Sequence, residues 1–213
     1  MQYFCSWSGG KDSCLALRWA IGQWGPPACL FTMLAEDGEH SRSHGLTPEV
    51  LRAQAEALGV PIDFGAATWG DYEAVYVQHL IALRAQGIEA GVFGDMDTEA
   101  HRAWEESVCR QAGMSAHLPL WQADRRALVQ EFLAAGFEAL IVTVDLRHVP
   151  ERFLGRPFDA VVEELEALGV DVSGEGGEFH TCVIGGPLFA HPIRCRQTAV
   201  RHQSDYAMVE LRL

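Results

Sequence analysis

The sequence has no apolar run long enough to cross a membrane and no pair of cysteines at metal-binding spacing. A membrane-spanning helix needs about 18 consecutive apolar residues, and no segment of this 213-residue chain reaches that length. The six cysteines, at positions 5, 14, 29, 109, 182 and 195, form no CxxC pair and accompany no histidine cluster at zinc spacing. We therefore expect buried free thiols in a reduced compartment, and neither a membrane span nor a structural zinc site.

Basic residues are also scarce. The chain has 16 lysines and arginines against 29 aspartates and glutamates, which gives a formal net charge of −13. Because general binding to nucleic acid or to an anionic membrane relies on neutralising phosphate groups, this charge argues against both. A local basic group remains at Arg194, Arg196, Arg201 and His202. The start of the chain lacks the basic and long apolar segments of a signal peptide, so we expect a cytoplasmic protein.

Strand-like apolar runs alternate with helical patterns through the first 145 residues. The strand-like runs are Met1–Trp7, Ala28–Leu34, Pro61–Gly65, Ala90–Gly94 and Ala139–Val144. The helical patterns cover Cys14–Ile21, Thr47–Gly59, Asp71–Gln86, Glu99–Ala112 and Asp124–Ala135. Such alternation predicts an α/β fold, in which a parallel sheet is covered by helices on both faces.

The alternation ends at Leu146. A helix is expected over Asp159–Leu168, and Ile193–Val200 and Ala207–Leu213 look like strands with no helix between them. This pattern predicts a smaller C-terminal α+β unit with antiparallel strands. We therefore expect a division into residues 1–145 and 146–213.

The stretch Ser8-Gly9-Gly10-Lys11-Asp12-Ser13 lies between the first strand and the first helix. A tight glycine turn at a helix start points backbone N–H groups and the positive end of the helix dipole at an anion, and a lysine adds a full charge. It is not a Walker loop, because Cys5 stands where that pattern needs glycine and Asp12 follows the lysine. The stretch predicts a site for phosphate groups.

Further polar residues follow the predicted strands. Ligands of parallel sheets bind at the carboxyl ends of the strands, where Ser41–Gly45, Asp95–Asp97 and Asp145 also fall. Asp95 and Asp97 could hold ribose or a metal, or cap the helix that follows. His40 and His44 could lie near an adenylate or be solvated loop residues.

The stretch Gly174-Glu175-Gly176-Gly177-Glu178 is rich in glycine and carboxylate. One interpretation is a solvent-exposed turn with charged side chains. The other is a backbone that approaches a ligand closely, with carboxylates that hold a cation, an amine or a metal. Both stay open from the residue types alone.

Ser8–Ser13 together with Glu175–Thr181 resembles the diphthine–ammonia ligase family, the amidating members of the PP-loop ATP pyrophosphatases. Gly136–Ala139, Phe153–Arg156 and Pro187–Phe189 are also similar to later segments of that family, so the resemblance covers the chain. It implies an adenine nucleotide α-hydrolase, Rossmann-like ATP-binding domain in residues 1–145 and a substrate-binding unit in residues 146–213. The implied activity is ATP-dependent amidation of the diphthine carboxylate on translation elongation factor 2, with ammonium as nitrogen source and AMP and pyrophosphate as products.

The resemblance also implies roles for single residues. The implied ATP- and pyrophosphate-binding residues are Ser8, Gly9, Gly10, Lys11, Asp12, Ser13, His44, Gly94 and Asp95. The implied substrate-binding residues are Gly174, Glu175, Gly176, Gly177, Glu178 and Thr181. Catalytic roles fall to Lys11, Asp12, Glu175 and Glu178. Mg²⁺ would accompany ATP with Asp12 as a ligand, although capping of the helix start is an equal role for that side chain.

Two positions depart from the family pattern. Ser43-His44-Gly45 stands where relatives tend to carry Met-Phe-His, and His180-Thr181 stands where they usually carry Glu-Thr. The acceptor is therefore left open between protein-bound diphthine and a small molecule with a carboxylate, and a homodimer is left open as well. The alternative hypotheses are a PP-loop enzyme that modifies RNA and a non-catalytic regulator that binds adenine nucleotides.

Overall fold

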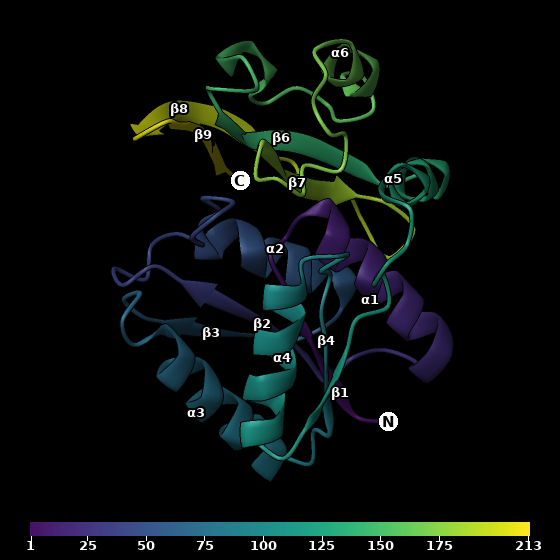
Figure 1. Ribbon diagram of the computed structural model, residues 1–213, viewed down its shortest axis with the longest axis vertical. Helices are drawn as coiled ribbons and strands as arrows, with labels where there is room; N and C mark the ends of the chain where they lie inside the picture. Colours follow the sequence, from purple (N-terminus) through teal and green to yellow (C-terminus); the bar gives the residue numbers. More distant parts are fainter. The chain divides into compact units, whose positions relative to one another are not determined.

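The computed structural model describes residues 1–213, and the contacts within the chain divide it into two units (Figure 1). The first unit consists of Met1–Ser8, Asp12–Ser41 and Val60–Ala123. The second unit consists of Gly9–Lys11, Arg42–Gly59 and Asp124–Leu213. Each unit contains one β-sheet.

The sheet of the first unit has five strands in the order β3-β2-β1-β4-β5, and every neighbouring pair is parallel. The strands are β1 (Tyr3–Ser6), β2 (Cys29–Leu34), β3 (Ile62–Ala66), β4 (Ala90–Val92) and β5 (Ser115–His117). The chain moves outward from β1 to β3 and then resumes on the other side of β1 with β4. The strand order therefore reverses between β1 and β4, which is where open α/β sheets bind ligands.

Helices cover both faces of this sheet, as predicted. They are α1 (Lys11–Trp24), α3 (Tyr72–Ala85) and α4 (Glu99–Gln111). Side chains of a strand alternate between its faces. On one face the ring of Tyr3 meets Trp24 of α1, with centroids 5.7 Å apart. On the other face Phe4 packs against Phe31 and Phe93, in an apolar core to which α3 and α4 contribute.

The sheet of the second unit has four strands in the order β7-β6-β9-β8, all antiparallel. The strands are β6 (Glu138–Asp145), β7 (Phe179–Gly185), β8 (Arg196–Gln203) and β9 (Tyr206–Arg212). The helices are α2 (Pro48–Leu58), α5 (Arg125–Ala134), the 3₁₀ turn η1 (Glu151–Phe153) and α6 (Val162–Ala167). Figure 1 shows α6 and α2 on opposite sides of this sheet. The predicted combination of a parallel sheet and a separate antiparallel sheet is confirmed.

One strand lies in a different sheet from the one expected. Ala139–Val144 was predicted to join the parallel sheet, but it forms most of β6, between β7 and β9. The fifth parallel strand is instead the short segment Ser115–His117. An apolar run indicates a strand buried on both faces, and such runs occur in both kinds of sheet, so its partners cannot be read from it. Asp145 consequently ends an antiparallel strand, where its carboxylate pairs with Arg147.

The residues predicted to cap two helices do so in the structure. Thr47 caps α2 by accepting a hydrogen bond from the N–H of Val50, and Pro48 occupies the first turn. The helix ends at Gly59, whose φ of 67° lies in the left-handed region that glycine adopts without strain. Asp124 caps α5 in the same way as Thr47 caps α2. None of the helices combines the length and apolar character that a membrane crossing requires.

Candidate active site

The turn Gly9–Lys11 and the start of β7 are joined by two hydrogen bonds within the second unit. The N–H of Lys11 donates to Thr181 Oγ1 over 3.0 Å. The N–H of Val183 donates to the carbonyl of Gly9 over 2.9 Å. The glycine turn and the segment after the second glycine-rich stretch are the two motifs that the sequence analysis singled out. The fold therefore brings them into direct contact.

A buried glutamine holds this junction from α2. Gln54 Nε2 donates to the carbonyl of Gly9 over 2.9 Å and to the carbonyl of Val183 over 2.8 Å. Its side chain is fully buried, on the face of α2 that also buries Val50 and Leu51. The sequence analysis missed Gln54. A polar residue on the apolar stripe of a helix is the signal that could have found it.

A side chain on either glycine of the turn would crowd its neighbours. Gly9 has a φ of +79°, and a Cβ there would lie 2.7 Å from Leu46 Cδ1. A Cβ on Gly10 would lie 2.6 Å from His44 Nε2 and 3.1 Å from the carbonyl oxygen of Thr181. Glycine therefore allows the backbone to approach the imidazole of His44 and the backbone of β7.

Lys11 is the only lysine of the chain. Only 5% of the residue is exposed, and its ammonium lies 5.7 Å from the centre of the Phe179 ring. A cation over the face of an aromatic ring is stabilised by the ring quadrupole. The arrangement holds a full positive charge beside the turn whose N–H groups were predicted to bind an anion.

The rings of two histidines lie next to each other beside this lysine. The ring centres of His44 and His180 lie 4.6 Å apart with an angle of 38° between their planes. Burial, and then the charge of Lys11, lowers the pKa of His180 to about 4. The pKa of His44 lies well below its usual value because of burial and then because of His180 and Lys11. Both imidazoles are therefore neutral at pH 7 and able to accept a proton or a hydrogen bond.

The glycine-rich acidic loop is anchored by an ion pair. Asp171 pairs with Arg125 of α5, and its carboxylate accepts a hydrogen bond from the N–H of Ser173. Gly174 has a φ of +68°, and a Cβ there would lie 2.8 Å from the carbonyl oxygen of Phe179. The loop is therefore folded tightly onto the start of β7 and is not a loose surface turn.

The carboxylate of Glu178 lies against the backbone of this loop. A Cβ on Gly176 would lie 2.6 Å from Glu178 Oε1, so the carboxylate would have to move if this position carried a side chain. Glu178 Oε2 is buried and has no hydrogen-bond partner. A buried acceptor without a donor costs free energy, which a ligand with N–H groups would recover. Glu175 is half-buried, and its backbone N–H donates to Ser173 Oγ.

The remaining residues of Ser8–Ser13, the stretch predicted to bind phosphate, lie in the first unit. The hydroxyls of Ser8 and Ser13 are 3.1 Å apart and hydrogen-bonded. A Cβ on Gly94 would lie 2.9 Å from the backbone N of Ser13 and equally close to the carbonyl carbon of Asp12. Glycine after β4 therefore lets this strand end close against the first turn of α1. Ser8, Asp12, Ser13 and Gly94 are brought together as the strand order predicts.

Asp95 is held by two neighbours. Its Oδ1 lies 2.7 Å from His101 Nδ1 of α4. Glu105 of the same helix is buried, and burial together with a hydrogen bond to Asp95 raises the pKa of its carboxyl to about 11. A protonated Glu105 can thus donate to Asp95. The sequence analysis missed Glu105, although it shares the apolar face of α4 with Val108 and Cys109.

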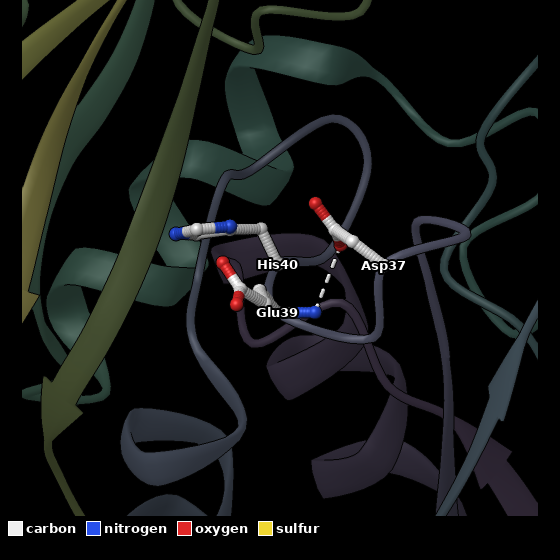
Figure 2. A group of neighbouring side chains, drawn as sticks. All are labelled: Asp37, Glu39 and His40. Atoms are coloured by element: carbon white, nitrogen blue, oxygen red, sulfur yellow. Dashed lines mark hydrogen bonds between the residues drawn. The ribbon is translucent and has the colours of Figure 1, made fainter.

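A second group of ionisable side chains lies in the loop after β2. Asp37, Glu39 and His40 each place one metal-ligand atom within 4.8 Å of the others (Figure 2). The N–H of Glu39 donates to Asp37 Oδ1 over 2.9 Å, which is a local turn hydrogen bond. Asp37 and Glu39 are exposed, and exposed acidic groups are common without an ion. We assign no metal to this group.

The chain matches two family models, one after the other. The model described as "Diphthamide synthase N-terminal domain" matches residues 1–116, and the model described as "Diphthamide synthase C-terminal domain" matches residues 124–212. The second match includes β6, in agreement with its place in the antiparallel sheet.

Similar proteins include curated relatives and a solved structure. A diphthine–ammonia ligase of Bos taurus is 28% identical over 93% of this chain and 84% of the relative. The human diphthine–ammonia ligase is 27% identical over 87% of this chain and 79% of the relative. A solved predicted subunit of tRNA methyltransferase from Methanocaldococcus jannaschii covers 87% of this chain and 98% of its own, with a TM-score of 0.46 and 16% identity. The last likeness is too weak to support an argument.

Proposed function

Because this chain belongs to the diphthamide synthase family, we propose that it is an ATP-dependent ligase that amidates a carboxylate with ammonia. The relatives named diphthine–ammonia ligase, matched over most of their length, support this reaction. A carboxylate attacks the α-phosphate of ATP, pyrophosphate leaves, and ammonia opens the acyl-adenylate to give the amide and AMP. The acceptor we propose is a diphthine-type carboxylate on a protein, and the reaction takes place in the cytoplasm.

In the first half of the reaction, the turn Ser8–Ser13 binds the pyrophosphate that leaves. The backbone N–H groups of the two glycines and the charge of Lys11 act together on the oxygens of the leaving group. Gly9 and Gly10 have no side chain, which leaves their backbone open to close approach, and a Cβ at either position would crowd neighbouring side chains. Further nucleotide-binding residues are proposed in each unit: His44 in the second, and Gly94 and Asp95 in the first, where Asp95 lies next to His101.

Mg²⁺ fits the donor set of the turn. The carboxylate of Asp12, in the first turn of α1, would supply a hard oxygen ligand of the kind that Mg²⁺ prefers. The ion would neutralise charge on the phosphates as pyrophosphate departs. Capping of α1 stays an alternative role for Asp12.

In the second half of the reaction, the loop Gly174–Thr181 binds the acceptor and ammonium. Glu178 has a buried oxygen with no hydrogen-bond partner, which suits an ammonium N–H. Glu175, three residues earlier in the same loop, is half-buried and adds a second carboxylate. We propose that these two carboxylates attract and orient the nitrogen nucleophile.

The observation that carries the proposal is the hydrogen-bonded junction between Gly9–Lys11 and β7. It joins the proposed phosphate-binding turn to the end of the acidic loop, as a reaction needs when ATP activates a carboxylate and an amine then attacks it. Fixing both halves in one framework lowers the entropy cost of bringing the reactants together. A protein that only bound adenine nucleotide would have no need of the second motif at this position.

The test is release of pyrophosphate from ATP in the presence of ammonium and elongation factor 2 that carries diphthine. We expect release to depend on the acceptor, and ¹⁵N-ammonium to appear in the modified residue. Lys11→Ala and Ser13→Ala should lower the rate by at least about 100-fold, while circular dichroism shows an intact fold. Arg126→Ala, a change of an exposed residue of α5, serves as the control.

Two outcomes would contradict the proposal. Binding of ATP without acceptor-dependent pyrophosphate release would favour a regulator, and release driven by RNA would favour an RNA-modifying enzyme. Full turnover in either turn variant would show that Ser8–Ser13 does not hold the leaving group.

A further inference from the structure

His44 and His180 form a pair of neutral imidazoles beside the glycine turn. The centres of its tilted rings are 4.6 Å apart, and a Cβ on Gly10 would lie only 2.6 Å from His44 Nε2. His180 directly precedes Thr181, the residue that accepts the hydrogen bond from the N–H of Lys11. The pair is therefore fixed to both motifs of the proposed reaction, on the side of the turn that faces β7.

The backbone around the pair is also held. The carbonyl of His44 accepts a hydrogen bond from Thr143 Oγ1 of β6 over 3.3 Å. His180 is paired in register with Thr143 across the antiparallel ladder between β6 and β7. His44 and His180 are far apart in the sequence, and Thr143 of β6 contacts the backbone of both. Such positioning fixes the backbone of both histidines and keeps their rings next to each other.

We propose that the His44–His180 pair is the general base that takes a proton from ammonium in the amide-forming step. This inference rests on the proposed ligase function and adds to it. It assigns deprotonation to the imidazoles, and it leaves Glu175 and Glu178 with the task of binding and orienting the nitrogen.

The amide-forming step conserves atoms and charge. The ammonium nitrogen forms a bond to the acyl carbon, the bond between that carbon and the phosphate oxygen of AMP breaks, and AMP leaves as the anion. Nitrogen goes from four N–H bonds to two, so two protons leave it. One proton goes to an imidazole nitrogen of the pair, and the other goes to water. No oxidant or reductant takes part.

Charged groups around the pair couple this base to ATP. Lys11 contributes to the low pKa of both imidazoles in the absence of nucleotide. Arg201 Nη2 lies 3.7 Å from the position of a Cβ on Gly45, next to His44, and Glu178 lies two residues from His180. Phosphate groups that bind Lys11 offset its charge, so the basicity of the imidazoles rises when the nucleotide is bound. Ammonium is then deprotonated only at an occupied site.

The experiment compares two nucleophiles with His44→Gln and His180→Gln. Glutamine keeps a polar side chain but cannot take a proton at neutral pH. Hydroxylamine is uncharged at pH 7 and needs no base before it attacks. We expect the rate of amide formation with ammonium to fall by about 100-fold or more in each variant, and to fall at least about 30-fold more than the rate with hydroxylamine. His191→Gln, at an exposed position, is the matched control.

The pH profile and an acceptor-free measurement complete the test. In the variants the ammonium rate should rise with pH as free ammonia increases. In wild type, histidine proton resonances should show the pKa of His180 moving up from about 4 toward neutrality when AMP and pyrophosphate are added.

Three outcomes would overturn the inference. The first is an equal loss in the rate of amide formation with ammonium and with hydroxylamine. The second is an unchanged rate with ammonium in the variants. The third is a pKa of His180 that does not change when AMP and pyrophosphate are added to the wild-type protein. Absence of any amide product with the wild-type enzyme would instead contradict the ligase function, and the resonance titration would still decide whether the pair responds to phosphate.

Discussion

The backbone N–H of Lys11 donates a hydrogen bond to Thr181 Oγ1 over 3.0 Å, although 170 positions separate the two residues in the sequence. This bond ties the start of α1 to the first residues of β7. Both residues are buried, so loss of the bond would leave a polar group without a partner. The relationship makes the glycine turn part of the second unit and leads to several predictions about that unit.

Lys11 offers a direct probe of nucleotide binding, because it is the only lysine. An amine-reactive reagent can modify only this side chain and the terminal amine. We expect ATP at 100 times its Kd to slow modification of Lys11 about 100-fold, since a bound phosphate shields the ammonium. Peptide mass spectrometry reads out both sites, and the terminal amine is the internal control. A Lys11 rate that is unchanged by ATP would contradict the assignment of the turn.

Gly10 and Gly22 form a matched pair of glycine positions. Gly10→Ala places a Cβ 2.6 Å from His44 Nε2, whereas nothing lies within 4 Å of a Cβ on Gly22. We expect Gly10→Ala to cost about 1–3 kcal/mol of unfolding free energy because of overpacking. Gly22→Ala, within α1, should gain about 0.5–1 kcal/mol. Urea unfolding measures both, and equal midpoints for the two variants would refute the close approach at Gly10.

Gln54→Leu tests the buried donor of α2. The substitution removes the N–H groups that Gly9 and Val183 accept from, in a fully buried position. We expect a loss of about 1–3 kcal/mol in unfolding free energy. Gln23→Leu, at an exposed position of α1, should change it by less than about 0.5 kcal/mol. Similar stabilities for the two variants would show that the junction does not depend on Gln54.

Glu105 predicts a pH dependence of stability in the first unit. Burial and the hydrogen bond with Asp95 raise the pKa of its carboxyl from 4.5 to about 11. The folded chain therefore keeps a proton that the unfolded chain releases, and stability falls as pH rises from about 4.5 toward 11. Glu105→Gln keeps an N–H donor for Asp95 and removes this loss. We expect the variant to be more stable than wild type at pH 8, with a smaller difference at pH 5.

The neighbouring Glu106 provides the control for this pH effect. Its side chain is 40% exposed and pairs with Arg102 four residues earlier on α4. Glu106→Gln should leave the pH dependence of the melting temperature close to that of wild type, because exposed ion pairs contribute little. If Glu105→Gln and Glu106→Gln show the same profile, the buried proton on Glu105 is refuted.

The sequence by itself determined the local features of this protein. The alternation of apolar patterns predicted a parallel sheet with helices on both faces, which the structure confirms. The glycine turn between a strand and a helix predicts a site for phosphate groups, and this stays a prediction. The caps at Thr47 and Asp124 were readable because a cap depends on residues three positions away. These features share one physical cause, which is that short-range geometry is fixed by neighbouring residues.

Tertiary structure alone decided which strands pair and which distant side chains meet. Ala139–Val144 lies in the antiparallel sheet, between β7 and β9, which come later in the chain. An apolar run predicts a buried strand but does not identify the strands with which it pairs. Gln54 and Glu105 became important only when burial removed water and left their polar atoms dependent on Gly9 and Asp95. The contact between the rings of His44 and His180 likewise exists only in the folded chain, where β6 holds the backbone of His44.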